Sequence, residues 1–260
     1  MRIQLTLRPA NRNTVLPVNY NYFLTGLIYR IIASSSTDYS RFLHDEGYKV
    51  GEGKNGFKLF AYSMLMDPKA RVNGQNISFS GKSIAWNITS PVSDFIQHLV
   101  TGVFAEGQEM KIGPDASPVH FRIEQVETLA NPQFSDTMRF SCLSPITIST
   151  HSGSKVSLTH YLRPWEKGLS DAIKNNLLKK YSLVHGKDLD DATLSIVVDS
   201  EYMNKRAGKI IKNIRFKDTN IIGFLAPLEV TGSPELIQIG YEAGFGEKGS
   251  MGFGMVKANT

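Results

Sequence analysis

Cysteine is almost missing from this chain of 260 residues, which contains a single one, Cys142. One thiol forms no internal disulfide and builds no zinc cluster that needs several thiolates. Cys142 lies in the strand-like run RFSCLS, which favours a buried side chain without a chemical role. We therefore expect neither disulfides nor a cysteine-based metal site.

Long apolar runs are also absent, since none approaches the roughly 20 residues that a membrane-spanning helix needs. The opening stretch MRIQLTLRPA alternates apolar with polar residues, which predicts a half-buried strand. A secretory signal peptide would instead place a continuous apolar core behind a basic head. These observations predict a cytoplasmic protein with no membrane partner.

Charge of one sign is not in large excess, because 29 Lys and Arg face 24 Asp and Glu and leave a net charge of +5. The balance of 41% apolar and 20% charged residues is typical of a packed globular protein. A mildly basic chain can bind a polyanion without requiring one. The H-E-x-x-H zinc motif and the G-x-x-x-x-G-K-[ST] phosphate loop are both missing, so we predict no metal and no other cofactor.

The first half of the chain reads as strand, helix, strand, strand, helix, strand. Apolar residues recur at helical spacing over 21–36, and Ser90 followed by Pro91 predicts the N-cap and first residue of a second helix. This order is that of the split βαβ, ferredoxin-like fold. Strands are predicted over residues 2–8, 58–66, 82–90, 120–129 and 137–150.

The second half repeats the same order of elements. Helices are predicted over 164–184 and 233–244, and strands over 145–150, 155–160, 192–200, 209–216, 221–232 and 252–258. We therefore predict an α+β protein made of two tandem ferredoxin-like (RRM-like) βαββαβ domains, residues 1–142 and residues 143–260.

A glycine-rich stretch, GYEAGFGEKGSMGFG, occupies residues 240–254 and contains a formal G-x-G-x-x-G match. A dinucleotide site needs a strand before this turn and a helix after it, whereas here a helix precedes and a strand follows. Apolar anchors such as Phe245 and Phe253 argue against the alternative of a flexible connection. Successive backbone N–H groups can cradle a phosphate, so we expect a phosphate contact at Gly244, Gly246, Lys248, Gly249 and Gly252.

Tyr29 and His44 are candidate reactive groups near the first predicted helix. Tyr29 lies roughly 150° from the centre of the apolar stripe, on a face that it shares with Tyr22 and Gly26. Such a position favours a side chain open to a ligand, although a surface tyrosine without a role fits as well. His44 follows the helix, and its imidazole can exchange protons near neutral pH.

On these residues the sequence resembles the CRISPR-associated endoribonucleases that process repeat RNA, within the RAMP superfamily. The stretch GYEAGFGEKGSMGFGMVK looks like the C-terminal glycine-rich motif of that family, and YFLTGLIYRII, FLH and KLFAYSMLM precede it in the family's order. The resemblance implies metal-independent cleavage of precursor CRISPR RNA within its repeats. The ribose 2′-OH would attack the adjacent phosphorus and leave 2′,3′-cyclic phosphate and 5′-OH ends.

The same resemblance implies a role for each catalytic candidate in the N-terminal domain. Tyr29 matches the proposed base, His44 the acid and Lys58 the cation that offsets charge on phosphorus, with Lys49 and Lys54 as alternatives to Lys58. A phenol has a pKa near 10, so Tyr29 would need a nearby cation to act as a base, and Lys58 could supply that field.

A basic stretch, NKRAGKIIKNIRFK, contains no acidic residue. It predicts contacts that follow the RNA backbone and weaken as salt rises, although a solvated edge strand protected by lysines is an alternative. Trp165 fits either stacking on a base or packing in the core. The basic candidates for RNA binding are Lys205, Arg206, Lys209, Lys212 and Arg215.

Two rival functions remain at this stage. A non-catalytic RAMP subunit would share the fold and the glycine-rich stretch and only bind RNA in a CRISPR effector complex, so only Tyr29 and His44 discriminate against it. A generic pair of RRM-like units is less favoured, because no RNP aromatic signature is found on a central strand. The expected partner is CRISPR repeat RNA, both precursor and product, and a homodimer or an effector complex stays open.

Overall fold

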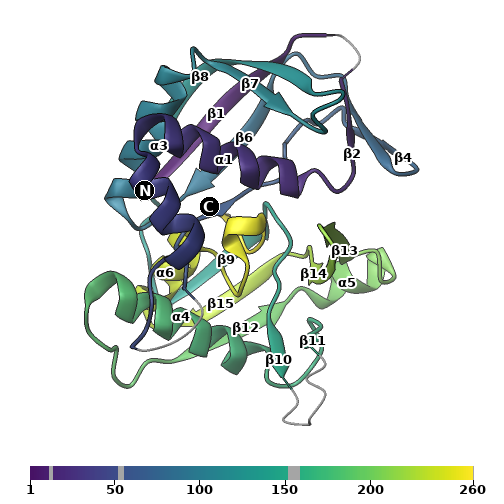
Figure 1. Cartoon of the computed structure of the whole chain (residues 1–260). Coiled ribbons are helices and arrows are strands. Elements are labelled where there is room, and N and C mark those ends of the chain that lie inside the picture. The colour runs from purple at the N-terminus through teal and green to yellow at the C-terminus, as the bar shows by residue number, and fades with distance from the viewer. Residues whose placement is uncertain (12–13, 52–55, 152–158, 260) are drawn as a thin grey trace.

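The computed structural model describes residues 1–11, 14–51, 56–151 and 159–259. The chain forms two units, each built on an antiparallel sheet with helices on one of its faces (Figure 1). No helix in the described ranges is both long enough and apolar enough to cross a membrane.

The first unit contains a five-stranded sheet of order β3-β6-β1-β8-β7. Without the edge strand β7, the four remaining strands follow the order of the ferredoxin-like fold, in which the first and third strands are central and antiparallel. Its elements are β1 (Arg2–Pro9), α1 (Asn21–Ser35), β3 (Ala61–Tyr62), β6 (Ile84–Thr89), α3 (Ser93–Ala105), β7 (Glu109–Ile112) and β8 (Val119–Leu129).

Alternation and helical spacing explain why this unit packs as it does. In β1 the apolar residues Ile3, Leu5 and Leu7 are buried, as the alternating sequence predicts. The predicted helix is confirmed as α1, which buries its stripe of leucine and isoleucine against the sheet. Helices α1 and α3 touch at Gly102, where an added Cβ would lie 1.8 Å from the carbonyl oxygen of Ile31.

Smaller elements decorate the first unit. Helix α2 (Thr37–Arg41) and the short π-helix η1 (Phe42–Glu46) continue directly from α1. A three-stranded sheet lies at the other end of the unit and contains β2 (Thr14–Pro17), β4 (Arg71–Asn73) and β5 (Asn76–Phe79).

The second unit has a four-stranded sheet of order β12-β15-β9-β16, again the ferredoxin-like order and wholly antiparallel. The prediction of tandem ferredoxin-like domains is therefore confirmed. The elements are β9 (Thr137–Cys142), α4 (Leu169–His185), β12 (Leu194–Val198), β15 (Leu228–Gly232), α6 (Pro234–Ala243) and β16 (Val256–Ala258).

Two hairpins and two short helical turns are inserted into the second unit. They are β10 (Ser149–His151) with β11 (Thr159–Tyr161), α5 (Ser200–Arg206), β13 (Ile211–Phe216) with β14 (Thr219–Phe224), and the 3₁₀ turn η2 (Gly249–Met251). The β13–β14 hairpin forms a sheet of its own rather than extending the four-stranded one.

Several predicted boundaries are wrong. The strand expected over 58–66 shrinks to β3, and α3 has Val92 rather than Ser90 as its N-cap. The Ser90 hydroxyl instead donates to the carbonyl of Leu59 at 2.8 Å. Strand β9 pairs with β15 and β16, so we place the boundary between the units before Thr137 and not at residue 142.

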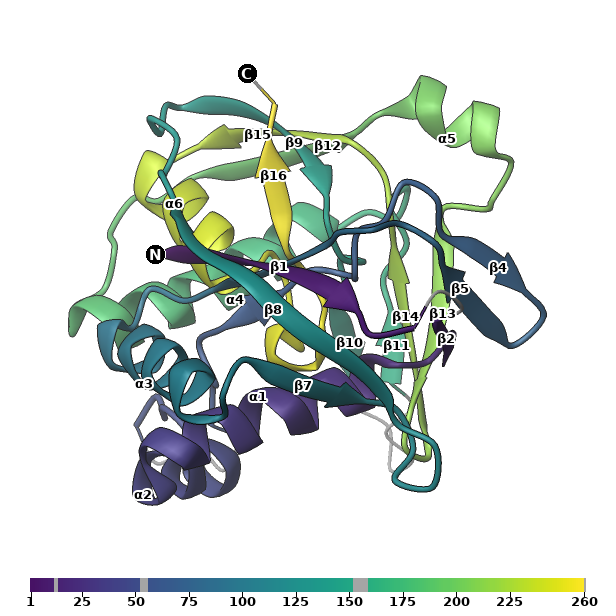
Figure 2. The same ribbon diagram turned by 90° about the horizontal axis from the view of Figure 1, so that it is seen from above.

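The two units are joined by contacts between residues that are far apart in sequence. The Arg2 guanidinium, only 2% exposed, donates to the carbonyls of Val256 at 2.8 Å and Tyr241 at 3.0 Å and lies 3.7 Å from the centroid of the Tyr241 ring. Seen from above, the C-terminal strand β16 approaches β1 (Figure 2). The first strand of one unit is thereby tied to the last helix and strand of the other.

Candidate functional site

Helix α1 supplies the first candidate side chain, Tyr29. The sequence places it off the buried stripe, and it is half-buried, with its ring against the edge of the first core. The Tyr29 ring lies edge-on to Phe60, with 6.3 Å between ring centroids. Gly26, one turn earlier, has no atom within 4 Å of an added Cβ, so the helix surface beside Tyr29 is open.

The π-helix η1 carries His44 to the same place. The Tyr29 and His44 ring centroids are 5.4 Å apart and the rings are nearly perpendicular, at 79°. The His44 side chain is 70% exposed, and its Nδ1 lies 2.7 Å from Oδ1 of Asp45. A carboxylate at Nδ1 leaves Nε2 as the imidazole nitrogen that can meet a substrate.

Lys58 reaches the same cluster from the segment before β3. Its Nζ donates to the backbone carbonyl of His44 at 2.7 Å. Partial burial lowers the pKa of Lys58, and the nearby Asp45 acts against that shift while Lys49 adds to it. Gly47 allows this approach because it has φ +67° and no side chain. A Cβ added at Gly47 would lie 3.1 Å from the Lys58 side chain.

The alternatives to Lys58 are in different positions. Lys49 is exposed and lies 3.7 Å from a carboxylate oxygen of Glu46. Lys54 lies outside the described residues. Of Lys49 and Lys58, the two that the structure describes, only Lys58 donates a hydrogen bond to the His44 backbone, so His44 contacts both Tyr29 and Lys58.

The protonation of Tyr29 differs from what its expected role as a base requires. Burial raises the pKa of Tyr29 to about 12, away from neutral pH. A base would need the opposite shift, and the role of Tyr29 as a base stays a prediction. At pH 7 the phenol is protonated and can donate a hydrogen bond.

The glycine-rich stretch is a joint between the units rather than an open loop. Gly244, Gly246 and Gly252 are buried, with φ between 83° and 84°. An added Cβ on Gly252 would lie 2.4 Å from Nδ2 of Asn21, and one on Gly246 would lie 2.3 Å from the carbonyl of Thr147. These glycines are needed for close approach to other parts of the protein, and the expected contact of their N–H groups with a phosphate stays a prediction.

The tip of that stretch remains half-exposed beside α1. Lys248, Gly249 and Ser250 lie there, and the carbonyl of Ser250 accepts a hydrogen bond from the Thr25 hydroxyl at 3.0 Å. Of the residues expected to contact RNA in this stretch, Lys248 and Gly249 therefore stay accessible. They border the helix face on which Tyr29 lies.

A buried lysine that the sequence did not single out holds the stretch in place. Lys180 on α4 is 5% exposed, and its Nζ donates to the carbonyls of Ala243 at 3.1 Å, Gly244 at 2.6 Å and Gly246 at 2.7 Å. Burial lowers the pKa of Lys180 to about 7, and Glu247 acts in the opposite direction. The three carbonyls match the three protons of an ammonium group. In the sequence, Lys180 is one of two lysines in LLKKY, and nothing marks it as buried.

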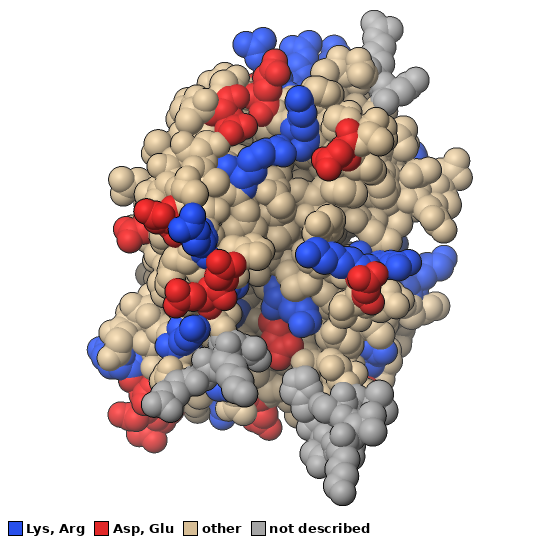
Figure 3. All heavy atoms as spheres, viewed as in Figure 1, with Lys and Arg blue, Asp and Glu red and all other residues tan. Residues whose placement is uncertain are grey.

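The basic stretch folds as α5 followed by strand β13, which is an edge strand of a two-stranded sheet, so the alternative of a solvated edge strand stays open. Blue side chains gather over the β13–β14 hairpin in Figure 3. Two of the cations have acidic neighbours, since Lys205 lies 3.9 Å from Glu201 and Arg215 lies 3.9 Å from Asp218. All five predicted residues are at least partly exposed: Lys205, Arg206, Lys209, Lys212 and Arg215.

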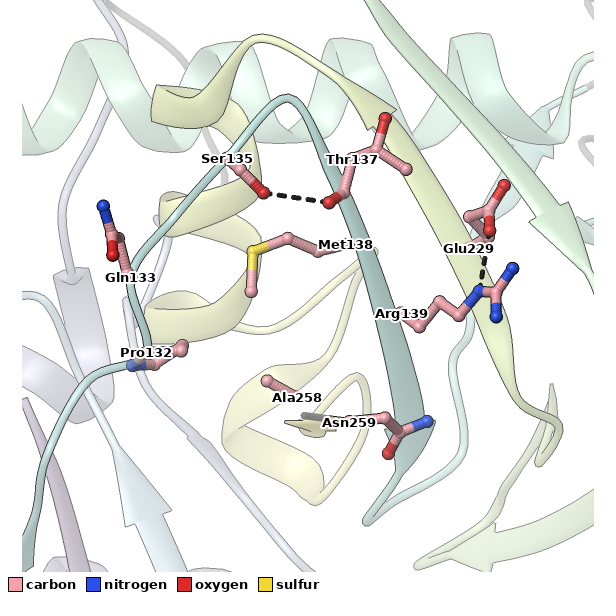
Figure 4. Close-up of a pocket in the computed structure, with 9 residues that line it drawn as sticks. All are labelled: Pro132, Gln133, Ser135, Thr137, Met138, Arg139, Glu229, Ala258 and Asn259. Atoms are coloured by element: carbon pink, nitrogen blue, oxygen red, sulfur yellow. Dashed lines mark hydrogen bonds and ion pairs between the residues drawn. The ribbon is translucent and has the colours of Figure 1, made fainter.

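Other surface features lie away from this cluster. A hollow of about 600 Å³ opens on the second unit beside β9 and β15, where Arg139 donates to Glu229 at 2.8 Å (Figure 4). None of the residues predicted for the site lines it. Trp165 is 61% exposed, which excludes the expected alternative of a core position.

Comparison with known proteins identifies the relatives of the whole chain. A family model described as CRISPR-associated protein Cas6, N-terminal, matches residues 15–127. A second, described as CRISPR associated protein Cas6, C-terminal, matches residues 129–258. The two models meet at the end of β8, between the two sheets.

Individual relatives agree with the family models. The chain is 32% identical to CRISPR-associated endoribonuclease Cas6 1 of Methanocaldococcus jannaschii, covering 98% of this chain and 92% of that protein. The solved structure of a Cas6-related protein from Pyrococcus furiosus superposes with a TM-score of 0.83 at 28% identity, covering 100% of this chain and 98% of that one. A RAMP protein described as binding different RNA substrates has a TM-score of 0.82, covers 100% of both chains, and at 24% identity shows the shared fold.

Proposed function

This chain belongs to the Cas6 family of CRISPR-associated proteins, and on that premise we propose that it cleaves precursor CRISPR RNA within its repeats. The curated relative from Methanocaldococcus jannaschii is named an endoribonuclease, which supports the same activity here. The observation that carries the proposal is that Tyr29 and Lys58 both contact His44, whose side chain is exposed.

The proposed reaction is a transesterification that uses no metal or other cofactor. The ribose 2′-oxygen forms a bond to the adjacent phosphorus, and the bond from phosphorus to the 5′-oxygen of the next nucleotide breaks. The 2′-OH loses a proton and the leaving 5′-oxygen gains one, so the products are a 2′,3′-cyclic phosphate and a 5′-OH. In this scheme the protein supplies an acid, positions the nucleophile and offsets charge on phosphorus.

His44 is the acid of this scheme. Its exposed imidazole can reach a substrate, and because Asp45 occupies Nδ1, the protonated ring donates from Nε2. Lys58 holds the carbonyl of His44 and brings a cation to the same position. The partial burial of Lys58 strengthens its field at a nearby phosphate.

Tyr29 has a modified role in this scheme. Because burial raises its pKa to about 12, Tyr29 acts as a protonated phenol that hydrogen-bonds to the 2′-oxygen or to a phosphate oxygen. It positions the nucleophile in line with phosphorus, and the 2′-OH proton passes to solvent. This replaces the expectation that Tyr29 is the base.

A non-catalytic RNA-binding subunit of a CRISPR effector complex is the second candidate. The feature that favours it is the burial of Tyr29, which raises its pKa to about 12 and leaves the phenol un-ionised at neutral pH. Both candidates share the fold and the RNA partner, and they differ only in whether the cluster cuts.

The deciding experiment is incubation with repeat RNA in EDTA, beside an RNA whose 2′-OH at the cleavage site is replaced by hydrogen. We expect cleavage of the first RNA only, with cyclic phosphate ends. His44→Ala should abolish cutting and leave RNA affinity within a few-fold. Binding without cleavage of any cognate repeat would establish the second candidate, and normal cutting by His44→Ala would remove His44 as the acid.

A further inference from the structure

One line of residues on α1 leads away from the proposed active site. Tyr22, Gly26 and Tyr29 follow one another at helical spacing and share a face. Seven residues separate the two tyrosines, or about 10 Å along the helix axis. Tyr22 is 42% exposed, and Gly26 between them leaves the helix surface uncovered.

The turn of the β13–β14 hairpin meets this line at Tyr22. The rings of Tyr22 and Phe216 are perpendicular, with 5.5 Å between centroids, and Nζ of Lys217 lies 5.3 Å from the Tyr22 ring centroid. The backbone N–H of Arg215 donates to Oδ1 of Asn19 at 3.0 Å, which ties the hairpin to the start of α1. An exposed tyrosine is thus held next to a basic turn from the other unit.

The glycine-rich stretch runs along the same line. The Thr25 hydroxyl donates to the carbonyl of Ser250, and Met251 and Phe216 both pack against one small apolar cluster. Lys248 lies at the tip of this stretch, half-exposed. Three cations therefore lie along the exposed face of α1. Lys217 of the hairpin lies at one end, Lys248 lies at the tip of the glycine-rich stretch, and Lys58 lies by the proposed active site.

This arrangement has the parts of a site for single-stranded RNA. Such sites combine cations that follow the phosphate backbone with aromatic rings on which bases stack. The Tyr22 ring is exposed, and Lys217 has a flexible side chain that can move from the ring to a phosphate. The separation of about 10 Å between Tyr22 and Tyr29 along the helix is short enough for neighbouring nucleotides of one RNA strand to reach both.

We propose that Tyr22, with Phe216 and Lys217, forms a stacking site for an unpaired nucleobase of the RNA close to the scissile phosphate held at Tyr29 and His44. The inference rests on the proposed function for the identity of the RNA. A base held at Tyr22 fixes which phosphate reaches His44, so this site determines the position of the cut.

The test measures binding of cognate repeat RNA whose cleavage-site 2′-OH is replaced by hydrogen, so that binding is read without cutting. Tyr22→Leu keeps apolar volume and removes the aromatic ring, and Tyr22→Trp keeps a stacking surface. We expect Tyr22→Leu to weaken binding by about 5- to 100-fold and Tyr22→Trp to bind within about two-fold of the wild type. Phe104→Leu, at an aromatic residue on α3 that is 56% exposed, is the matched control and should bind as the wild type does.

A second measurement separates stacking from a structural role of Tyr22. Repeat RNAs with a single abasic nucleotide are scanned across the cleavage site. At one position the abasic change should weaken wild-type binding and have no further effect on Tyr22→Leu, because the same contact is already lost. A structural defect would lower binding of every abasic RNA by the same factor, and that result would overturn the inference.

The outcomes distinguish this inference from the proposed function. If the wild type cleaves unmodified repeat RNA but no abasic position loses its effect in Tyr22→Leu, the stacking site alone is overturned. A coupled position without any cleavage of the unmodified RNA supports the stacking site and overturns the nuclease. No binding of repeat RNA by the wild type overturns both.

Discussion

Replacing Lys180 by methionine should lower the free energy of unfolding by about 3–5 kcal/mol. Methionine keeps most of the apolar stem and removes the ammonium group. The carbonyls of Ala243, Gly244 and Gly246 then lose the donor that lies 2.6–3.1 Å away. Each buried carbonyl left without a partner costs about 1–3 kcal/mol, and relief from burying a charge offsets part of the sum.

The assay is urea unfolding of the wild type, Lys180→Met and Lys179→Met, followed by circular dichroism. Lys179 is the matched control because it is exposed on the same helix, so its replacement should change the unfolding free energy by less than about 0.5 kcal/mol. If Lys180→Met is as stable as Lys179→Met, the three hydrogen bonds do not hold the glycine-rich stretch and the reasoning is refuted.

The pH dependence of the same pair gives a second check. Burial lowers the pKa of Lys180 to about 7 in the folded protein, from 10.5 for an ordinary lysine. Between these values the unfolded chain binds more protons, so the unfolding free energy of the wild type should rise with pH relative to Lys180→Met. A difference that stays flat across this window would show that the three carbonyls keep the ammonium charged.

Two further predictions concern the cluster and the helix contact. Lys58→Met should slow single-turnover cleavage by about 100-fold, because it removes both a cation and the donor to the His44 carbonyl, and Lys58→Arg should recover part of the rate. Equal rates for Lys58→Met and the wild type would assign the cation elsewhere. Gly102→Ala should cost about 2–4 kcal/mol in thermal unfolding, since its Cβ would overlap the Ile31 carbonyl, whereas Gly26→Ala, with open space, should stabilise α1 by about 0.5–1 kcal/mol. Equal melting temperatures for these two variants would contradict the contact between α1 and α3.

The order of helices and strands could be predicted from the sequence because local patterns determine it. The buried stripe of α1 and the alternation of β1 are visible in the residues themselves. The single strand predicted over 221–232 is divided between β14 and β15, which belong to different sheets, because sheet membership depends on pairing partners that no local pattern reveals.

The candidate site was predictable only in part. Tyr29, His44 and Lys58 were chosen through the resemblance to the family, and the structure places the three together. Whether those residues catalyse a reaction stays a prediction. The glycine-rich stretch was recognised, but its burial was not, because the groups that cover it come from distant parts of the chain. Lys180 was missed for the same reason, since its three acceptors lie more than 60 residues away.

The joint between the two units has a consequence for the order of events during synthesis. Arg2 is bound by a carbonyl 254 positions later in the chain, and the glycine-rich stretch that packs against α1 also comes near the end. A ribosome delivers the first ferredoxin-like unit long before these partners emerge. The first unit must therefore wait with its contact surface uncovered until the glycine-rich stretch and β16 have left the ribosome.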